Sequence, residues 1–232
     1  IKENAKIGTA KGGDATASGK DGGCGIRNHG QFTMSGGTIT NAVGGTAAGR
    51  DGGDGIYCGD TLTIEGGEIQ KATGGTATGD GGYGIRSNVA LTINGGKIEQ
   101  ATGGDATGSR GTGGSGIGST GTLTIAGGEI QEATGGNATG TFGTGGSGIS
   151  GGNRISLVKI LGGIITKAKG GDATGEDGTG GTGIRSDGEL KISGGKIEQT
   201  TGGASTGGDG GSGGHGIRSG STLSIDRATI EN

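Results

Sequence analysis

The chain has 232 residues, of which 69 are glycine, and it contains neither proline nor tryptophan. Collagen is excluded, because glycine does not occupy every third position and proline is absent. Hydrophobic residues make up 26% and aromatic residues 2%, which argues against the wide core of a conventional enzyme. The net charge of −3 offers no bulk positive charge to nucleic acid, and no apolar run approaches the ~20 residues of a membrane-spanning helix.

One repeated motif runs through the whole chain. The dipeptide Gly-Ile recurs at steps of 29 to 35 residues, a spacing typical of solenoids and other repeat arrays. The sequence therefore predicts one β-solenoid domain over residues 1–232, as a segment of a longer chain. We expect a partial coil at 1–23 and coils that start near residues 24, 54, 83, 115, 147, 182 and 215.

The coil at 54–82 illustrates the predicted elements in chain order. A first short strand starts at 55–56, and a second covers 62–64. A Gly-Gly turn at 66–67 leads to a third strand, which carries the inward Ile69. One coil buries few aliphatic side chains, so coils must stack at ~4.8 Å to build a core. We expect an all-β, single-stranded, right-handed parallel β-helix of about seven coils of ~32 residues, because parallel crossovers are right-handed.

A glycine-rich segment, such as 73–82, extends each coil beyond these strands. In several coils its glycines fall three apart, as at Gly108, Gly111 and Gly114, and three is the period of polyproline II. Free glycine loops lose much entropy on ordering, yet these segments repeat closely. We hypothesise a side lobe of stacked, extended arms beside the β-helix. The alternative is a row of mobile surface loops.

The residue after Gly-Ile points outward, because the isoleucine points inward. Spaced arginines with one tyrosine can grip sugar hydroxyls or carboxylates, so this column is the candidate carbohydrate-binding site. The alternative is that these side chains form a solvated face, which keeps the protein soluble and protects the edges of the sheet. The next residue in each coil, such as Ser87 or Cys58, faces inward at a corner, where a ladder of hydroxyls is expected. The candidate binding residues are Arg27, Tyr57, Arg86, Arg185 and Arg218.

Threonines form an unbroken column in the arms. Regular threonine rows on flat solenoids resemble those of ice-binding proteins, which would make ice the partner. The alternative is that the hydroxyls cap the backbone. A second threonine row, on the second strand of each coil, is interrupted by Leu157 and Lys159. The candidate ice-binding residues are Thr78, Thr107, Thr139, Thr174 and Thr206.

Acidic residues in the arms suggest a metal site, since oxygen-rich glycine turns can hold calcium. The densest cluster is Asp172, Glu176 and Asp177, although its spacing matches neither an EF-hand loop nor a calcium-binding nonapeptide. Solvated turn residues are the alternative. Calcium is thus the one cofactor that the sequence suggests.

No catalytic site is expected. His29 and His215 are six coils apart, so they cannot share a metal or a triad. A polysaccharide lyase or hydrolase would need a locally distinct cluster of carboxylates and bases, and the coils are too alike to contain one. Two cysteines, Cys24 and Cys58, make no disulfide framework, and we expect both to be free thiols.

Stretches such as 183–186 and 190–197 resemble repeats of bacterial extracellular β-helix proteins, in particular the carbohydrate-binding β-helix domains of anaerobic Firmicutes. The resemblance implies a secreted or wall-attached protein that binds acidic plant polysaccharide with calcium. The long Gly/Thr arms depart from that family. We expect a non-enzymatic surface-display or fibre segment, or an adhesin.

In the last coil, 226–228 replaces the Gly-Gly turn and no cap follows, which predicts flanking sequence or end-to-end self-association.

Overall fold

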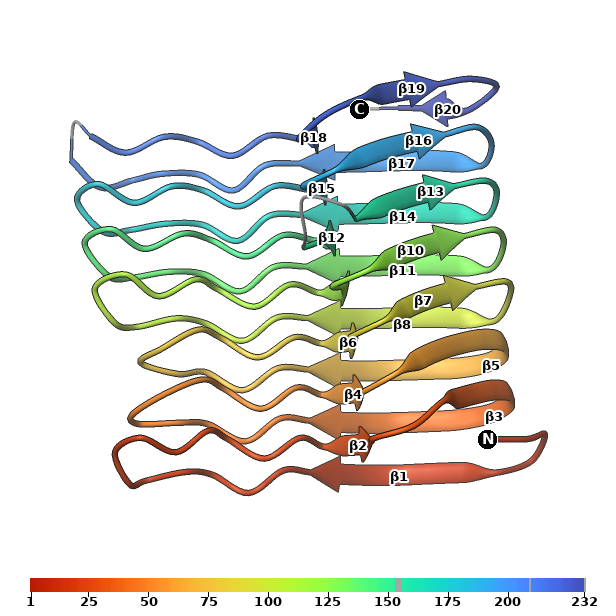
Figure 1. The fold of residues 1–232 in the computed structure, drawn as a ribbon, viewed down its shortest axis with the longest axis horizontal. Coiled ribbons are helices and arrows are strands. Elements are labelled where there is room, and N and C mark those ends of the chain that lie inside the picture. Colours follow the sequence, from red (N-terminus) through yellow and green to blue (C-terminus); the bar gives the residue numbers. More distant parts are fainter. Residues whose placement is uncertain (153–155, 209, 232) are drawn as a thin grey trace.

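Parallel β-sheets stack into a solenoid of about seven turns, as the repeat predicts (Figure 1). This computed structural model describes residues 1–152, 156–208 and 210–231. Within those ranges there is no helix, and so none that is long and apolar enough to cross a membrane. Strands occupy one side of Figure 1, and the glycine-rich arms extend from them on the other side.

The strand that follows each Gly-Ile pair is three residues long. Seven of these strands form one parallel sheet, in the order β18-β15-β12-β9-β6-β4-β2. In the strands at 56–58, 85–87 and 184–186, the first and third residues are buried and the middle one is half-buried, as the predicted column requires. The strands are β2 (Ile26–Asn28), β4 (Ile56–Cys58), β6 (Ile85–Ser87), β9 (Ile117–Ser119), β12 (Ile149–Gly151), β15 (Ile184–Ser186) and β18 (Ile217–Ser219).

The second and third strands of each coil belong to a thirteen-stranded sheet, which bends at the Gly-Gly turns. Its two halves are joined because β3 (Phe32–Val43) and β5 (Thr61–Thr73) continue through the turn. The second glycine of the turn has positive φ, 85° at Gly67, a conformation that side chains disfavour. The remaining strands are β1 (Lys6–Lys11), β7 (Ala90–Ile93), β8 (Lys97–Thr102), β10 (Thr122–Ile125), β11 (Glu129–Thr134), β13 (Leu157–Ile160), β14 (Ile164–Lys169), β16 (Glu189–Ile192), β17 (Lys196–Thr201), β19 (Leu223–Ile225) and β20 (Thr229–Ile230).

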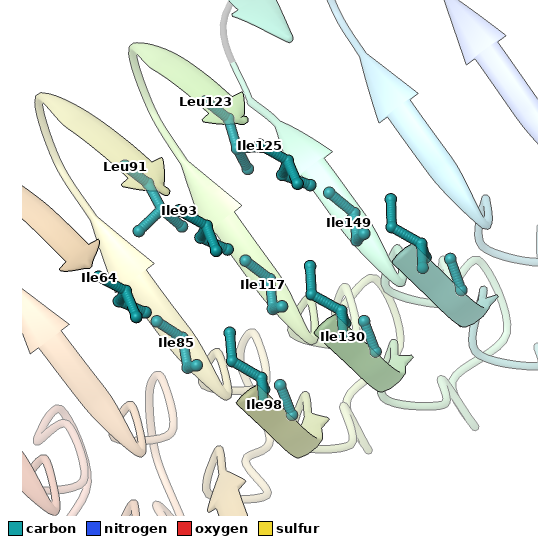
Figure 2. Packing of buried hydrophobic residues seen from close by; sticks show 14 of the residues in the cluster. Ile64, Ile85, Leu91, Ile93, Ile98, Ile117, Leu123, Ile125, Ile130 and Ile149 are labelled. Carbon is teal, nitrogen blue, oxygen red and sulfur yellow. The ribbon is translucent and has the colours of Figure 1, made fainter. Parts of the chain in front are cut away.

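Equivalent aliphatic side chains stack along the axis and form the core (Figure 2). Ile85 pairs with Ile117, which in turn pairs with Ile149, and all three side chains are fully buried. Leu91 and Leu123 pair in the same way on the neighbouring face. The axial stacking that the sequence predicts is therefore confirmed.

Several side chains at the inward corners, those of Cys58, Ser87 and Ser219, bond to backbone carbonyls. The hydroxyl of Ser87 lies 2.6 Å from the carbonyl oxygen of Asp60 and 2.7 Å from that of Ala90. Cys58 occupies the same place one coil earlier, and its sulfur lies 3.1 Å from the carbonyl oxygen of Gly30. The expected hydroxyl ladder is thus wrong, because the carbonyls of the same and the preceding coil lie within reach.

The arms are ordered and stacked. Outgoing and returning arms alternate in one hydrogen-bond ladder, in which the Gly114 amide donates to the Gly104 carbonyl and the Gly136 amide to the Gly114 carbonyl, each at 2.8 Å. A Cβ on Gly136 would overlap the carbonyl oxygen of Gly104, so glycine is required by close approach of two backbones. The predicted lobe of stacked arms is confirmed, and the mobile-loop alternative is wrong.

Candidate functional site

Two cavities lie one after the other where returning arms join the seven-stranded sheet, and together they are called the groove. The Asp54 cavity, of about 200 Å³, lies over the first coils, and the Ser150 cavity, of about 220 Å³, lies over the middle coils. The side chains of the Asp54 cavity are Asp21, Cys24, Arg27, Asp51, Asp54, Tyr57 and Arg86. Those of the Ser150 cavity are Tyr83, Thr112, Ser115, Ser147, Ser150, Arg185 and Asp187.

Asp54 is the most buried carboxylate of the groove, with 5% of its surface exposed. It accepts a 2.7 Å hydrogen bond from the Tyr83 amide, and its other oxygen lies 4.0 Å from the Arg86 guanidinium. Burial raises the pKa of Asp54 from 3.8 to about 6, although the Tyr83 amide and Arg86 act in the opposite direction. The carboxyl group therefore changes charge near pH 6.

Two tyrosine rings lie against two of the three arginines of the groove. The guanidinium of Arg27 lies 5.3 Å from the ring centre of Tyr57, and that of Arg86 lies 5.0 Å from the ring centre of Tyr83. Tyr57 also accepts a 2.7 Å hydrogen bond from the side-chain amide of Asn88. Burial raises the pKa of Tyr83, so its phenol stays protonated and can donate a hydrogen bond.

The column of outward arginines is interrupted in the middle coils, and the Ser150 cavity lies at this interruption. Gly118 and Ser150 occupy the positions that Arg86 and Arg185 occupy in the flanking coils. A Cβ on Gly118 would lie 2.5 Å from the ring of Tyr83, so this ring lies against the Gly118 backbone. The cavity thus replaces the missing long side chains.

The structure brings most of the predicted carbohydrate-binding column into this groove. Arg27, Tyr57 and Arg86 line the Asp54 cavity, and Arg185 lines the Ser150 cavity. Arg218, on the last coil, lies outside both cavities.

Sequence reasoning missed Asp54, Tyr83 and Asp187. The first two occupy the position just before Gly-Ile, whose residue type changes from coil to coil. That variability in an otherwise regular repeat was a usable signal, although no feature of the sequence alone shows that the returning arm packs beside it.

Both cysteines are free thiols, as expected, and they lie in different surroundings. Cys58 is buried at its corner, whereas Cys24 is half-buried and lines the Asp54 cavity. Burial raises the pKa of Cys24, so the thiol form is favoured at neutral pH.

The candidate ice-binding threonines lie on the outgoing arms, away from the groove. They are exposed and in register, and each backbone amide donates to a carbonyl of the preceding coil, as Thr139 does to Ala106. The column is one residue wide. Its members are Thr78, Thr107, Thr139, Thr174 and Thr206.

The acidic cluster predicted for calcium is divided along its arm. Asp172 accepts a 2.8 Å hydrogen bond from the Ala204 amide and lies 3.3 Å from the Lys169 ammonium. Glu176 and Asp177 lie further out and are exposed. Among residues 1–152, 156–208 and 210–231, no group of three or more His, Cys, Asp or Glu side chains is placed to hold a metal ion.

Carboxylates in the arms instead bind the backbone of the following coil. Asp105 accepts the amide of Asn137 at 2.7 Å, and Asp80 accepts the amide of Thr112 at 2.8 Å. Hydrogen bonds to a charged acceptor are among the stronger ones in proteins. These acidic residues therefore stabilise the stack of arms.

The fold and groove together define a parallel β-solenoid with a lateral lobe of arms. No protein-family model, no curated protein and no solved structure matches the chain.

Proposed function

We propose that the protein is a non-enzymatic, extracellular adhesive solenoid that binds polysaccharide along its groove. One observation carries the proposal: four of the five arginine and tyrosine side chains of the predicted column, Arg27, Tyr57, Arg86 and Arg185, line two consecutive cavities. A linear polymer suits such a site, because the cavities follow one another along the axis. The resemblance of the repeats to carbohydrate-binding β-helix domains of anaerobic Firmicutes supports the same function and location.

The chemistry of the groove matches sugar hydroxyls, which both donate and accept hydrogen bonds. Arginine and tyrosine supply donors, and the carboxylates of Asp54 and Asp187 supply acceptors. The tyrosine rings fix Arg27 and Arg86, so little side-chain freedom is lost when a ligand binds. The groove is therefore organised before the ligand arrives.

A glycan array, followed by polysaccharide pull-down with and without calcium, tests the proposal. We expect retention on at least one polysaccharide and weaker retention for Arg86→Ala and Arg185→Ala. Arg110→Ala is the matched control, since Arg110 lies over Phe142 in the arms, outside both cavities. If no glycan is retained under either condition, the adhesive function is wrong and a scaffold role is left.

Ice binding is the second candidate function, and the exposed, in-register arm threonines favour it. Stacked coils would space these hydroxyls at about 4.8 Å, one per coil. The measurement is thermal hysteresis, which Thr139→Tyr should abolish because a bulky ring interrupts the column. Thr33→Tyr, at an exposed position of β3, is the control. Absence of hysteresis in the unmodified protein excludes this function.

A further inference from the structure

The break in the arginine column creates a site with its own chemistry. Between Arg86 and Arg185, the outward positions hold Gly118 and Ser150, which leave the Ser150 cavity open. Tyr83 bounds this cavity, and Arg185 also lines it. The repeat therefore departs from its pattern at the place where the groove is hollow.

The part of the cavity lining that the structure describes is polar, and its charges balance. Ser115 and Ser150 lie in it with their hydroxyl oxygens 3.1 Å apart. Among the described lining residues, only Arg185 and Asp187 are charged, and the Arg185 Nε donates to Asp187 at 2.6 Å. The guanidinium keeps further N–H donors and the carboxylate keeps a further acceptor. Donors and acceptors thus lie side by side, the arrangement that neighbouring sugar hydroxyls can satisfy.

Size limits the ligand to a single ring. At about 220 Å³ the cavity lies below the range of roughly 300–1,000 Å³ that accommodates drug-sized ligands. A carboxylate on the ligand would meet an arginine whose charge Asp187 already balances. An uncharged ligand does not need the positive charge of Arg185, so the Arg185–Asp187 ion pair does not weaken its binding.

We infer that the Ser150 cavity receives one uncharged pyranose ring, whose adjacent hydroxyls bind the Arg185–Asp187 pair and whose remaining hydroxyls meet the serines and Tyr83. This inference rests on the proposed polysaccharide binding and makes the Ser150 cavity the subsite that selects neutral sugars over uronic acids.

Titration with methyl glycosides of glucose, galactose and mannose, and with those of the matching uronic acids, tests the inference. Binding is followed by NMR shifts of the Ser150 and Tyr83 amides. At least one neutral glycoside should bind more tightly than its uronate. Asp187→Asn should weaken the neutral sugar by about tenfold, the loss expected for one hydrogen bond to a charged group, and should improve the uronate because Arg185 is freed. Asp226→Asn alters an exposed Arg–Asp pair, with Arg227, that lies outside both cavities, and it should change neither affinity.

The outcomes separate the inference from the proposed function. If polysaccharides are retained on the array but no neutral glycoside shifts the cavity amides, the inference is wrong and the adhesive function stands. A uronate that binds more tightly than its neutral partner, or an Asp187→Asn variant with unchanged selectivity, also overturns the inference. If the neutral glycoside binds in the cavity but no polymer is retained, the inference stands and the adhesive function fails.

Discussion

Gly113→Ala tests the structural basis of the arms, on which the groove depends. A Cβ on Gly113 would overlap the carbonyl oxygen of Gly136 and would lie 2.8 Å from the nitrogen of Gly146. Both neighbours are backbone atoms of stacked arms, so they cannot turn away as a flexible side chain would. The arm itself must move.

The cost follows from what that movement breaks. The Gly113 amide donates to the Thr144 carbonyl and the Gly146 amide to the Gly136 carbonyl, both at 2.8 Å. Two lost hydrogen bonds at about 1 kcal/mol each, with about 1–3 kcal/mol for overpacking, give a destabilisation of about 3–5 kcal/mol.

Gly213→Ala is the matched control, at the equivalent position of the last returning arm. The nearest atom to its added Cβ is the carbonyl oxygen of Gly203, at 3.9 Å. We expect this substitution to be neutral or to stabilise by up to about 1 kcal/mol, because alanine restricts the unfolded chain. Urea unfolding measures the stability, and native-state amide exchange of Gly136 and Gly146 measures the arm. Equal stability and equal exchange in the two variants would refute the close-packed arms.

Three further substitutions test the groove, the corners and the core. Asp54→Asn should flatten the dependence of stability on pH. The pKa of Asp54 is raised in the folded state, so the unmodified protein should lose up to about 3 kcal/mol of stability as the pH rises from 3.8 to about 6. Urea unfolding at pH 4 and pH 7 measures this loss. Ser87→Ala removes the corner hydrogen bonds and should cost about 1–2 kcal/mol, whereas no loss in urea unfolding would contradict that role. Ile117→Ala should cost about 2–5 kcal/mol, and Leu223→Ala, at a residue 46% exposed, much less; similar thermal shifts for the two would contradict the axial core.

The fold could be predicted because every coil repeats the same inward positions. Once Ile85 must stack on Ile117, a slip of one residue would turn the whole strand outward, so the register is determined by the sequence pattern. The order of the arms followed from their glycine spacing. The sequence does not show why glycine is required there. The Cβ that would be added to Gly136 overlaps Gly104, which belongs to a different coil, and only the structure shows that the two residues meet.

The candidate site was only partly predictable, because its walls come from segments far apart in the sequence. The outward arginines follow from alternation along a strand, but the cavity beside them depends on how the returning arm packs. Asp54 illustrates the limit: in the sequence it is one of several acidic residues beside the arm glycines, and only its burial beside Arg86 makes it distinctive. Asp105 is also an acidic arm residue, and the sequence does not show that its carboxylate accepts the Asn137 amide of the following coil.

The most direct test of the account is to map, by NMR of the isotope-labelled chain, where a polysaccharide selected on the array binds. The account predicts shifts concentrated at groove residues of successive coils, including Tyr57, Tyr83 and Arg185. Shifts confined to the outer face of the arms, around Thr139, or no shifts with any polysaccharide, would contradict it.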